Sequence, residues 1–394
     1  MQPARIVIAG GSIGGLTAAC LLRDAGHDVT VYERSSTELE QRGAGIGLLE
    51  ASARYLITRA GIAIDDISIA TDRIRYLGRS GRIIHEQVHR YRFSSWNTIY
   101  RRLLGAFGPD RYRLGHEVVG WASAGGAVVV QLADDTAIEA DLLICADGVG
   151  SSARARLQPD ASARYAGYVA WRGMVPEGEL QPALAQRLGE AITYHVLANS
   201  HILVYPIPGL DGSVVPGERL INFVWYRNYL EGEELDELLT DRDGQCRQLS
   251  VPPGKVADHH RDEVRATAVA RLPADMADVV LKIRALFLQV VYDIEVERMA
   301  FDRVCLIGDA ACVARPHAAA GTAKAAEDGW ALAAALAKAE SIEGALADWE
   351  PRQVRLGRAL VERARRIGRR SQVDNAWVPG DPELLFGLHA AGER

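Results

Sequence analysis

Side chains with acid–base chemistry stand beside predicted turns at two places in this chain. His201 and Tyr205 are four residues apart in the apolar run 201–207, which predicts a β-strand, so strand alternation places both on one face. His317 follows Pro316 in a loop rich in small residues. Because histidine titrates near neutral pH, His317 can hold or remove a proton of a bound ligand.

Each of these residues also has a purely structural interpretation. Tyr205 can pack with its hydroxyl satisfied at a strand end while His201 faces solvent beside the turn, and His317 can bond to nearby backbone at a helix N-terminus. Arg172, in a Trp-Arg-Gly turn, can orient an anionic ligand or clamp two domains together. The residue types alone leave both interpretations open.

The loop around His317 lies between a predicted strand and a predicted helix. Residues 304–307 are apolar and end in Gly308-Asp309, which leaves a carboxylate at the carboxyl end of a strand, where open α/β sheets bind ligands. The run 316–322 has almost no side chains to keep a flat ring away from the amide groups of the next helix. Those N–H groups and the helix dipole suit a negatively charged ring edge or phosphate. A small-residue turn made for close packing is the alternative.

The N-terminal segment has the pattern of a nucleotide-binding turn. Residues 5–9 predict a strand that runs into GGSIGG at 10–15 and then a helix, and a second strand, 28–32, ends at Glu33. This order fits the dinucleotide fingerprint G-x-G-x-x-G, with an acid for the ribose about 20 residues later. Ser12 replaces the middle glycine, so its hydroxyl must either turn away from a phosphate or hydrogen-bond to it.

A third apolar strand, 142–146, ends in Asp147-Gly148, so three strand ends are expected to meet at one ligand. With these motifs in order, the chain resembles the FAD-dependent aromatic hydroxylases, which are class A flavoprotein monooxygenases with the para-hydroxybenzoate hydroxylase fold. The resemblance covers nearly the whole chain. It rests on the glycine turn with Glu33-Arg34, GAGIG at 43–47, ADG at 146–148, and GDAA at 308–311 followed by Pro316 and Glu327-Asp328.

Further segments are similar to the branch of this family that hydroxylates pyridine rings. They are GGSIGGLTAA at 10–19, GYVAWRG at 167–173, YPIPG at 205–209, RPHAAAG at 315–321 and FGL at 386–388. Two positions depart from the wider family. Ala319-Ala320-Gly321 stands where much of the family has Gly-Gln-Gly, and Trp96 aligns with a flavin-contacting arginine. These departures concern the mobility of the flavin ring rather than the presence of flavin.

The resemblance implies a permanently bound FAD, with NADH or NADPH as a transient co-substrate and O2 as the oxidant. FAD contacts are expected at the strand ends and in the loops that follow them. The expected residues are Gly10, Ser12, Ile13, Gly14, Gly15, Glu33, Arg34, Gly45, Val119, Asp147, Gly148, Asp309, Pro316, Ala320, Gly321 and Thr322.

The activity that the resemblance implies is hydroxylation of a small hydroxylated aromatic ring through a flavin C4a-hydroperoxide. Tyr205, His201, Arg172 and Pro316 are expected to bind the substrate, a hydroxypyridine such as 2,6-dihydroxypyridine. His317, with Tyr205 and His201, is the expected catalytic relay that stabilises the deprotonated ring hydroxyl. Alternatives are a phenolic or larger polyketide-type ring, or a flavin-binding redox sensor that does not hydroxylate.

Composition agrees with a large soluble enzyme. The 394 residues are 48% hydrophobic, enough for a large core and two domains, and the net charge of -6 argues against nucleic acid as a partner. No apolar run is long enough to suggest a membrane span, and the first strand begins too early for a signal peptide. The five cysteines have no metal-ligand spacing and read as reduced thiols of a cytoplasmic protein, so no metal site is expected.

The predicted fold is α/β, with a Rossmann-like FAD-binding domain interleaved with a β-sheet substrate domain and followed by C-terminal helices. We expect residues 1–73, 97–165 and 291–394 in the FAD-binding domain, and 74–96 and 166–290, a β-rich stretch, in the substrate domain. From Ile342 the chain is expected to be helical, and its many arginines indicate a solvated or interdomain face. A homodimer is expected by resemblance alone.

Overall fold

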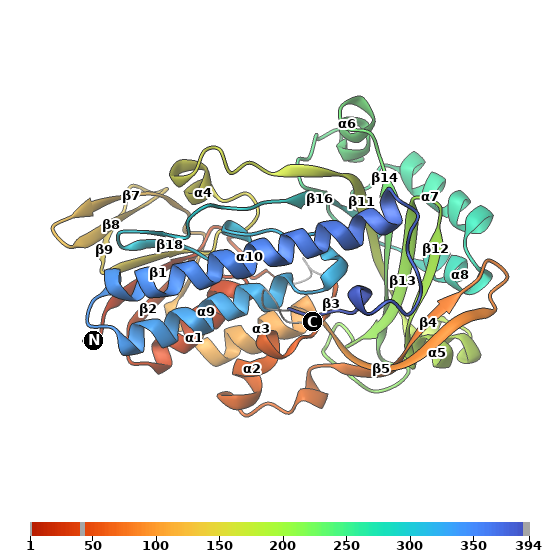
Figure 1. Cartoon of the computed structure of the whole chain (residues 1–394), viewed down its shortest axis with the longest axis horizontal. Helices are drawn as coiled ribbons and strands as arrows, with labels where there is room; N and C mark the ends of the chain where they lie inside the picture. The colour runs from red at the N-terminus through yellow and green to blue at the C-terminus, as the bar shows by residue number, and fades with distance from the viewer. Residues whose placement is uncertain (1, 40–43, 389–394) are drawn as a thin grey trace.

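A six-stranded sheet forms one half of the protein in this computed structural model, which describes residues 2–39 and 44–388 (Figure 1). Its strand order is β17-β18-β10-β1-β2-β6, and β1, β2, β6, β10 and β18 run parallel. The carboxyl ends of these five strands therefore point the same way. The bounds are β1 (Arg5–Ala9), β2 (Asp28–Glu33), β6 (Tyr112–Leu114), β10 (Leu142–Cys145), β17 (Ala300–Phe301) and β18 (Val304–Leu306).

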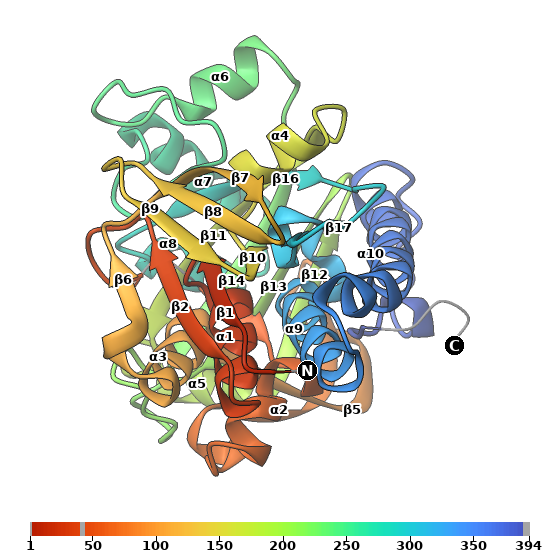
Figure 2. The ribbon, with the colours of Figure 1, turned by 90° about the vertical axis from the view of Figure 1, so that its left-hand side faces the viewer.

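Helices pack closely on this sheet because small residues line their contacts. Helix α1 (Ile13–Asp24) lies against α9 (Gly321–Lys338), and a Cβ at Gly329 would come within 3.2 Å of the Ala18 backbone. Helices α2 (Glu50–Thr58) and α3 (Trp96–Phe107) complete this layer. A three-stranded meander, visible in Figure 2, contacts the central strands β1 and β10 of this sheet: β7 (Val118–Ala124), β8 (Ala127–Leu132) and β9 (Ala137–Ala140).

A nine-stranded mixed sheet forms the other half, in the order β15-β16-β11-β14-β13-β12-β4-β5-β3. Residues 45–47 join it as β3, from within the segment expected in the FAD-binding domain. The strands are β3 (Gly45–Gly47), β4 (Ile69–Leu77), β5 (Ile83–Ser95), β11 (Arg164–Pro176), β12 (Ala191–Leu197), β13 (Ser200–Ile207), β14 (Leu220–Asn228), β15 (Ser250–Val251) and β16 (Phe287–Asp293).

Strand alternation divides the nine-stranded sheet into two different faces. One face is apolar, with Trp171, Ile202 and Trp225 in a core covered by helices. The opposite face carries tyrosines and histidines. The covering helices are α5 (Pro182–Gly189), α6 (Glu233–Leu239), α7 (Asp258–Arg271) and α8 (Ala274–Lys282).

The predicted strands at 5–9, 28–32, 142–146, 194–197, 202–207 and 220–226 all fall within observed strands, apart from Ala146 just past the end of β10. The β-rich prediction for 166–290 is wrong between 233 and 282, where the chain is mostly helical. In α8 the buried residues Met276, Ala277, Val279 and Val280 recur at helical spacing, so this segment packs one side on the sheet.

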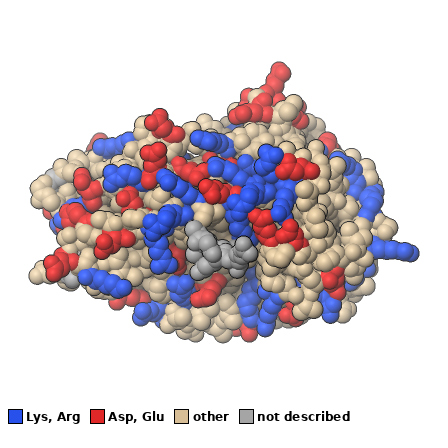
Figure 3. Space-filling view, viewed as in Figure 1, with Lys and Arg blue, Asp and Glu red and all other residues tan. Residues whose placement is uncertain are grey.

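Helix α10 (Ile342–Gln372) runs along one side of the molecule from the six-stranded sheet to the nine-stranded sheet (Figure 1). Several of its arginines contact the C-terminal segment, while others, such as Arg352, Arg366 and Arg369, have mostly exposed side chains. Arg363 donates to carbonyl oxygens of Glu383, Leu385 and Gly387, and Arg370 pairs with Asp381 and Glu383. Basic and acidic side chains are interspersed on this face (Figure 3). The described part of the chain has no helix long and apolar enough to cross a membrane.

Candidate active site

The glycine turn after β1 is built for close backbone packing. Gly10 has φ +103°, and a Cβ there would lie 2.3 Å from the Ala146 carbonyl oxygen. At Gly15 a Cβ would lie 2.1 Å from the Gly10 oxygen. Ser12 caps α1 in extended conformation without a side-chain capping bond, so its half-exposed hydroxyl and the first amides of α1 are open to a ligand.

Glu33 holds the same turn from the end of β2. Its carboxylate accepts hydrogen bonds from the Gly11 and Ser35 amides, both at 2.9 Å, and it is buried. The sequence predicted a ribose contact for Glu33, and in this structure its described bonds are to backbone. The neighbouring Arg34 is exposed, as is Val119 on β7.

The other two strand ends meet beside this turn and are tied together by Arg154. Its guanidinium donates to the carbonyl oxygens of Val149 and Ala310, at 2.6 and 3.1 Å, and so joins the Asp147 loop to the Asp309 loop. One carboxylate oxygen of Asp147 is buried without a hydrogen-bond partner. Asp309 is exposed, although the strand before it is fully buried.

The small-residue loop before α9 contacts the nine-stranded sheet at β3. Ala319 adopts the left-handed conformation, with φ +50°, and a Cβ at Gly47 would lie 2.8 Å from its side chain. At Gly45 a Cβ would lie 2.7 Å from the Tyr205 ring. Gly43, the first residue of the GAGIG motif, lies outside the described residues. Around Gly321 a Cβ would meet nothing within 4 Å, which leaves its amide approachable.

These features fit FAD. Several of the predicted cofactor residues at the strand ends, among them Ser12, Asp147 and Asp309, are at least partly accessible while the strands themselves are mostly buried, which is the arrangement of a ligand-binding sheet edge. The uncapped first amides of α1 could bind a diphosphate, and those of α9 could bind the edge of a ring. Trp96, at the start of α3, stacks on Tyr100 with ring centroids 4.9 Å apart.

The opposite wall of the site is one face of the nine-stranded sheet. Three neighbouring strands contribute tyrosine and histidine side chains to it, since Tyr226 on β14 pairs with Ala170 on β11 and with His201 on β13. The face is buried and aromatic. Its polar members are Tyr168, Arg172, His201, Tyr205, Asn222 and Tyr226.

His317 projects from the loop into this aromatic face. Its Nε2 lies 2.7 Å from the Tyr168 hydroxyl, and its Nδ1 is buried without a hydrogen-bond partner. Burial lowers the pKa of His317 well below its usual value, and His201 and Arg315 lower it further, so the imidazole is neutral. The alternative that His317 merely bonds to nearby backbone does not match these contacts.

His201 is buried, so the interpretation that it faces solvent is wrong. Its Nδ1 lies 2.9 Å from the Ser371 hydroxyl on α10, and its ring centroid lies 5.3 Å from that of His317. The ring also packs on Tyr226 and Trp377, with centroids 4.7 and 4.6 Å away. Burial lowers the pKa of His201 to about 3.

Tyr205 and Arg172 converge on one backbone atom. The Tyr205 hydroxyl and an Arg172 guanidinium nitrogen both donate to the Gly45 carbonyl oxygen, at 3.0 and 2.7 Å. Arg172 also bonds Gln289, which makes it a clamp between strands, yet its Nε is buried without a partner. Asn222 accepts from the Gly45 amide and leaves its Nδ2 unpartnered.

The residue analysis of the sequence missed Tyr168, Tyr226 and Arg315. Tyr168 is four residues before Arg172 on one strand, so alternation alone would have put both on one face. Arg315 lies over the Tyr168 ring, 5.6 Å from its centroid, and makes a buried ion pair with Asp293 at 2.9 Å. A basic residue next to Pro316 was the available signal.

Glycine turns at a sheet edge beside a buried face of histidine and tyrosine side chains are the arrangement of an FAD-dependent monooxygenase of aromatic rings. The chain belongs to this family. It is 38% identical over 390 residues, 99% of this chain and 97% of the other, to a 2,6-dihydroxypyridine 3-monooxygenase of Paenarthrobacter nicotinovorans. As in its relatives, FAD is the cofactor and NAD(P)H and O2 are co-substrates.

Other comparisons agree with this family. The solved structure of 2,6-dihydroxypyridine-3-hydroxylase from Arthrobacter nicotinovorans superposes with a TM-score of 0.92 at 37% identity, covering 98% of this chain and 97% of that one. A 6-hydroxynicotinate 3-monooxygenase of Pseudomonas fluorescens is 26% identical, covering 98% of this chain and 95% of that one. Family profiles described as "FAD binding domain", "FAD binding domain-like" and "NAD(P)-binding Rossmann-like domain" match residues 245–364, 165–293 and 8–37.

Proposed function

We propose that this enzyme hydroxylates a hydroxypyridine, with 2,6-dihydroxypyridine as the first candidate. The observation that carries the proposal is the buried Nδ1 of His317, a polar atom with no partner at the centre of an aromatic face. An unpartnered buried polar atom is costly unless a ligand satisfies it. Two relatives named above act on pyridine rings, which supports the same substrate class.

His317 is the proposed acceptor of the ring hydroxyl proton. When Nε2–H donates to Tyr168, Nδ1 presents a lone pair to the substrate hydroxyl, and withdrawing that proton raises electron density on the ring. A neighbouring pyridinolate would raise the pKa of His317 from its low value, since an opposite charge favours the imidazolium. Tyr205 and His201 are proposed to orient the ring, and Arg172 Nε to bond a ring oxygen.

Bound FAD, once reduced by NAD(P)H, supplies the activation of O2 from which one oxygen atom passes to the ring. The chain's own residues must hold the cofactor and exclude water. We propose that the residues expected from the sequence hold it: Gly10, Ser12, Ile13, Gly14, Gly15, Glu33, Arg34, Gly45, Val119, Asp147, Gly148, Asp309, Pro316, Ala320, Gly321 and Thr322. Pro316 is also a proposed substrate contact.

The direct test follows NADH and NADPH consumption by the purified flavoprotein with and without 2,6-dihydroxypyridine, measuring H2O2 and hydroxylated product. Ligand-stimulated oxidation with product formation supports the proposal. Oxidation that yields only H2O2, or no stimulation, rejects this substrate and directs the screen to phenols and larger rings. Failure with every ring would favour the flavin-binding redox sensor.

The role of His317 has its own test. His317→Asn should retain the flavin spectrum but lose roughly 10²- to 10⁴-fold in coupled hydroxylation, which is the usual contribution of a general base. His89→Asn is the matched control, because His89 lies on β5 and is not among the side chains of the aromatic face. Normal coupled turnover in His317→Asn would remove His317 from the mechanism.

We also propose that the protein is cytoplasmic and forms a homodimer. The proposed division into domains is the one expected from the sequence. All five cysteines are free thiols and four of them are buried, which suits a reducing compartment. The dimer rests on family resemblance and is tested by light scattering coupled to size-exclusion chromatography, where a mass of one chain would reject it.

A further inference from the structure

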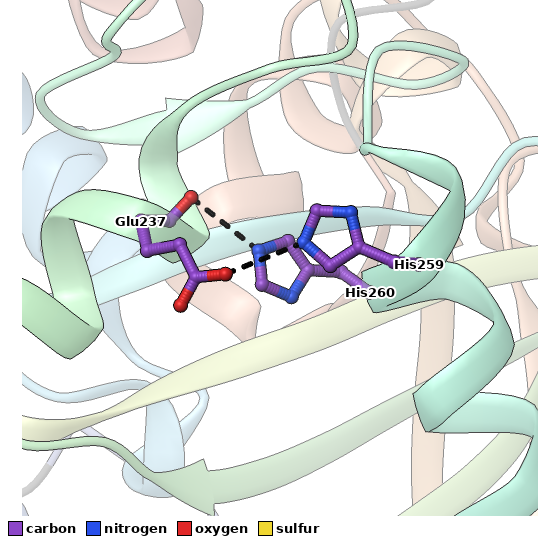
Figure 4. A group of neighbouring side chains, drawn as sticks. All are labelled: Glu237, His259 and His260. Carbon is purple, nitrogen blue, oxygen red and sulfur yellow. Dashed lines mark hydrogen bonds and ion pairs between the residues drawn. The ribbon is translucent and has the colours of Figure 1, made fainter.

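Three metal-ligating side chains meet on the outer layer of the substrate sheet, between helices α6 and α7. Glu237 projects from α6, and His259 and His260 from the first turn of α7 (Figure 4). Their ligand atoms all lie within 4.8 Å of one another, and His259 Nε2 is 3.5 Å from the Glu237 carboxylate. None of the three belongs to the active site described above.

We propose that Glu237, His259 and His260 bind a divalent transition-metal ion, with Zn²⁺ as the best match. Zn²⁺ takes imidazole nitrogen and carboxylate oxygen at about 2.0–2.2 Å, so two ligands on a shared tetrahedral ion are about 3.3–3.5 Å apart. The His259–Glu237 separation already has this value. Two neutral imidazoles and one carboxylate leave a fourth position for water.

The surroundings leave room for the ion and for small adjustments. Glu237 and His259 line a hollow of about 430 Å³, which gives the fourth ligand access from solvent. His260 Nε2 now makes only a long contact, 3.3 Å, to the Glu237 carbonyl oxygen, so turning it to a metal costs little. Asp241, in the same hollow, is already bonded to Arg247 and backbone amides and is not needed as a ligand.

A metal here would join the two ends of the connection between α6 and α7. Leu238 of α6 and Val264 of α7 pack in the core behind the sheet, with Trp171 and Trp225 between them and the active-site face. The ion would therefore stabilise the outer layer by binding only the folded state, and it would leave the hydroxylation chemistry untouched. Only His259 and His260 are adjacent in the chain and Glu237 belongs to another helix, so no ligand spacing in the sequence marked the site.

The test uses the holoenzyme after treatment with a chelator and titrates it with Zn²⁺ in a calorimeter. We expect one ion per chain, a higher melting temperature with Zn²⁺, and at least tenfold weaker binding in His259→Asn and in Glu237→Gln. His89→Asn on β5 and Cys246→Ser, which removes the exposed thiol between the helices, are controls that should bind like the wild type.

Three outcomes would overturn the proposal. The first is no binding at micromolar Zn²⁺. The second is equal binding in His259→Asn and the wild type, which means an adventitious ion only. The third is loss of binding in Cys246→Ser, which would place the ion on the thiol. Turnover of the ring substrate should be unchanged in all of these variants. A failure of the metal proposal can therefore be told apart from a failure of the proposed hydroxylase function.

Discussion

Burial is the main reason that the two site histidines are neutral. His201 and His317 are both inside the aromatic face, and the pKa of each is lowered because a charged imidazole would lose its hydration there. A neutral imidazole can accept a substrate proton, and it can also be protonated when acid unfolds the protein. Burial of these two histidines therefore makes the stability of the folded protein depend on pH.

The sign of this sensitivity follows from the pKa of His201, about 3 in the folded protein against an ordinary value of 6.5. Between these values the unfolded chain binds a proton that the folded protein does not, so stability is lost as pH falls below 6.5 and is unaffected above it. Each pH unit in this window costs about 1.4 kcal/mol. From pH 7.5 to 5.0, His201 should contribute about 2 kcal/mol of lost stability.

Urea unfolding of the wild type and His201→Gln at the two pH values measures this effect. The variant should lose about 2 kcal/mol less than the wild type between pH 7.5 and 5.0, whatever its stability at pH 7.5. His89→Asn replaces a histidine that is only partly buried, and it should lose as much stability between the two pH values as the wild type. The same loss in all three proteins would mean that His201 keeps an ordinary pKa.

At the scale of elements, the last turns of α10 support the hydrogen-bonded pair of Tyr168 and His317. Gly368 packs directly on it, and a Cβ there would lie 2.6 Å from the Tyr168 hydroxyl and 3.0 Å from the His317 ring. Ser371, one turn later, bonds His201. Helix α10 thus fixes both histidines, although it supplies no residue that the sequence analysis placed in the site.

Gly368→Ala should therefore separate Tyr168 from His317. We expect retained FAD, a higher share of H2O2 and a fall of tenfold or more in coupled turnover, because such a displacement misaligns the reacting groups. Gly105→Ala in α3 is the control, since a Cβ there meets nothing within 4 Å and alanine favours a helix. An equal share of H2O2 in the two variants would show that the loop carrying His317 shifts to accept the new methyl group. Helix α10 would then not fix the positions of Tyr168 and His317.

How far the sequence predicts these elements depends on whether the signal is local. Strand ends marked by Gly308-Asp309 or by the GGSIGG turn were identified because a glycine turn and an apolar run are adjacent in the chain. Tyr226 was not, because its place beside Tyr168 and His201 depends on β14 lying between β11 and β13. Strand order is set by long-range pairing, which one sequence does not display.

At the scale of the whole molecule, Asp293 connects three parts of the structure. It lies at the end of β16 and pairs with Arg315 of the loop before α9 and with Arg365 of α10, both at 2.9 Å. Arg315 in turn lies over the Tyr168 ring. This nearly buried carboxylate links the nine-stranded sheet, the loop before α9 and helix α10, and through Arg315 and Tyr168 it reaches His317.

Asp293→Asn keeps the shape of this junction but removes its negative charge. Breaking a buried ion pair by neutralising one partner costs about 3–5 kcal/mol, and we expect the lower end because Arg365 keeps its second partner, Glu295. Asp243→Asn, which breaks the exposed pair with Lys255, should cost about 0–1 kcal/mol. Urea unfolding at pH 7.5 compares them.

The same two variants also separate stability from catalysis. If Asp293 positions Arg315, then Asp293→Asn should release more H2O2 per NAD(P)H at temperatures where it is fully folded, and Asp243→Asn should not. A destabilised but fully coupled Asp293→Asn would confine the carboxylate to holding the two sheets together. A stability loss no larger than that of Asp243→Asn would show that the three parts are joined by packing of α10 alone.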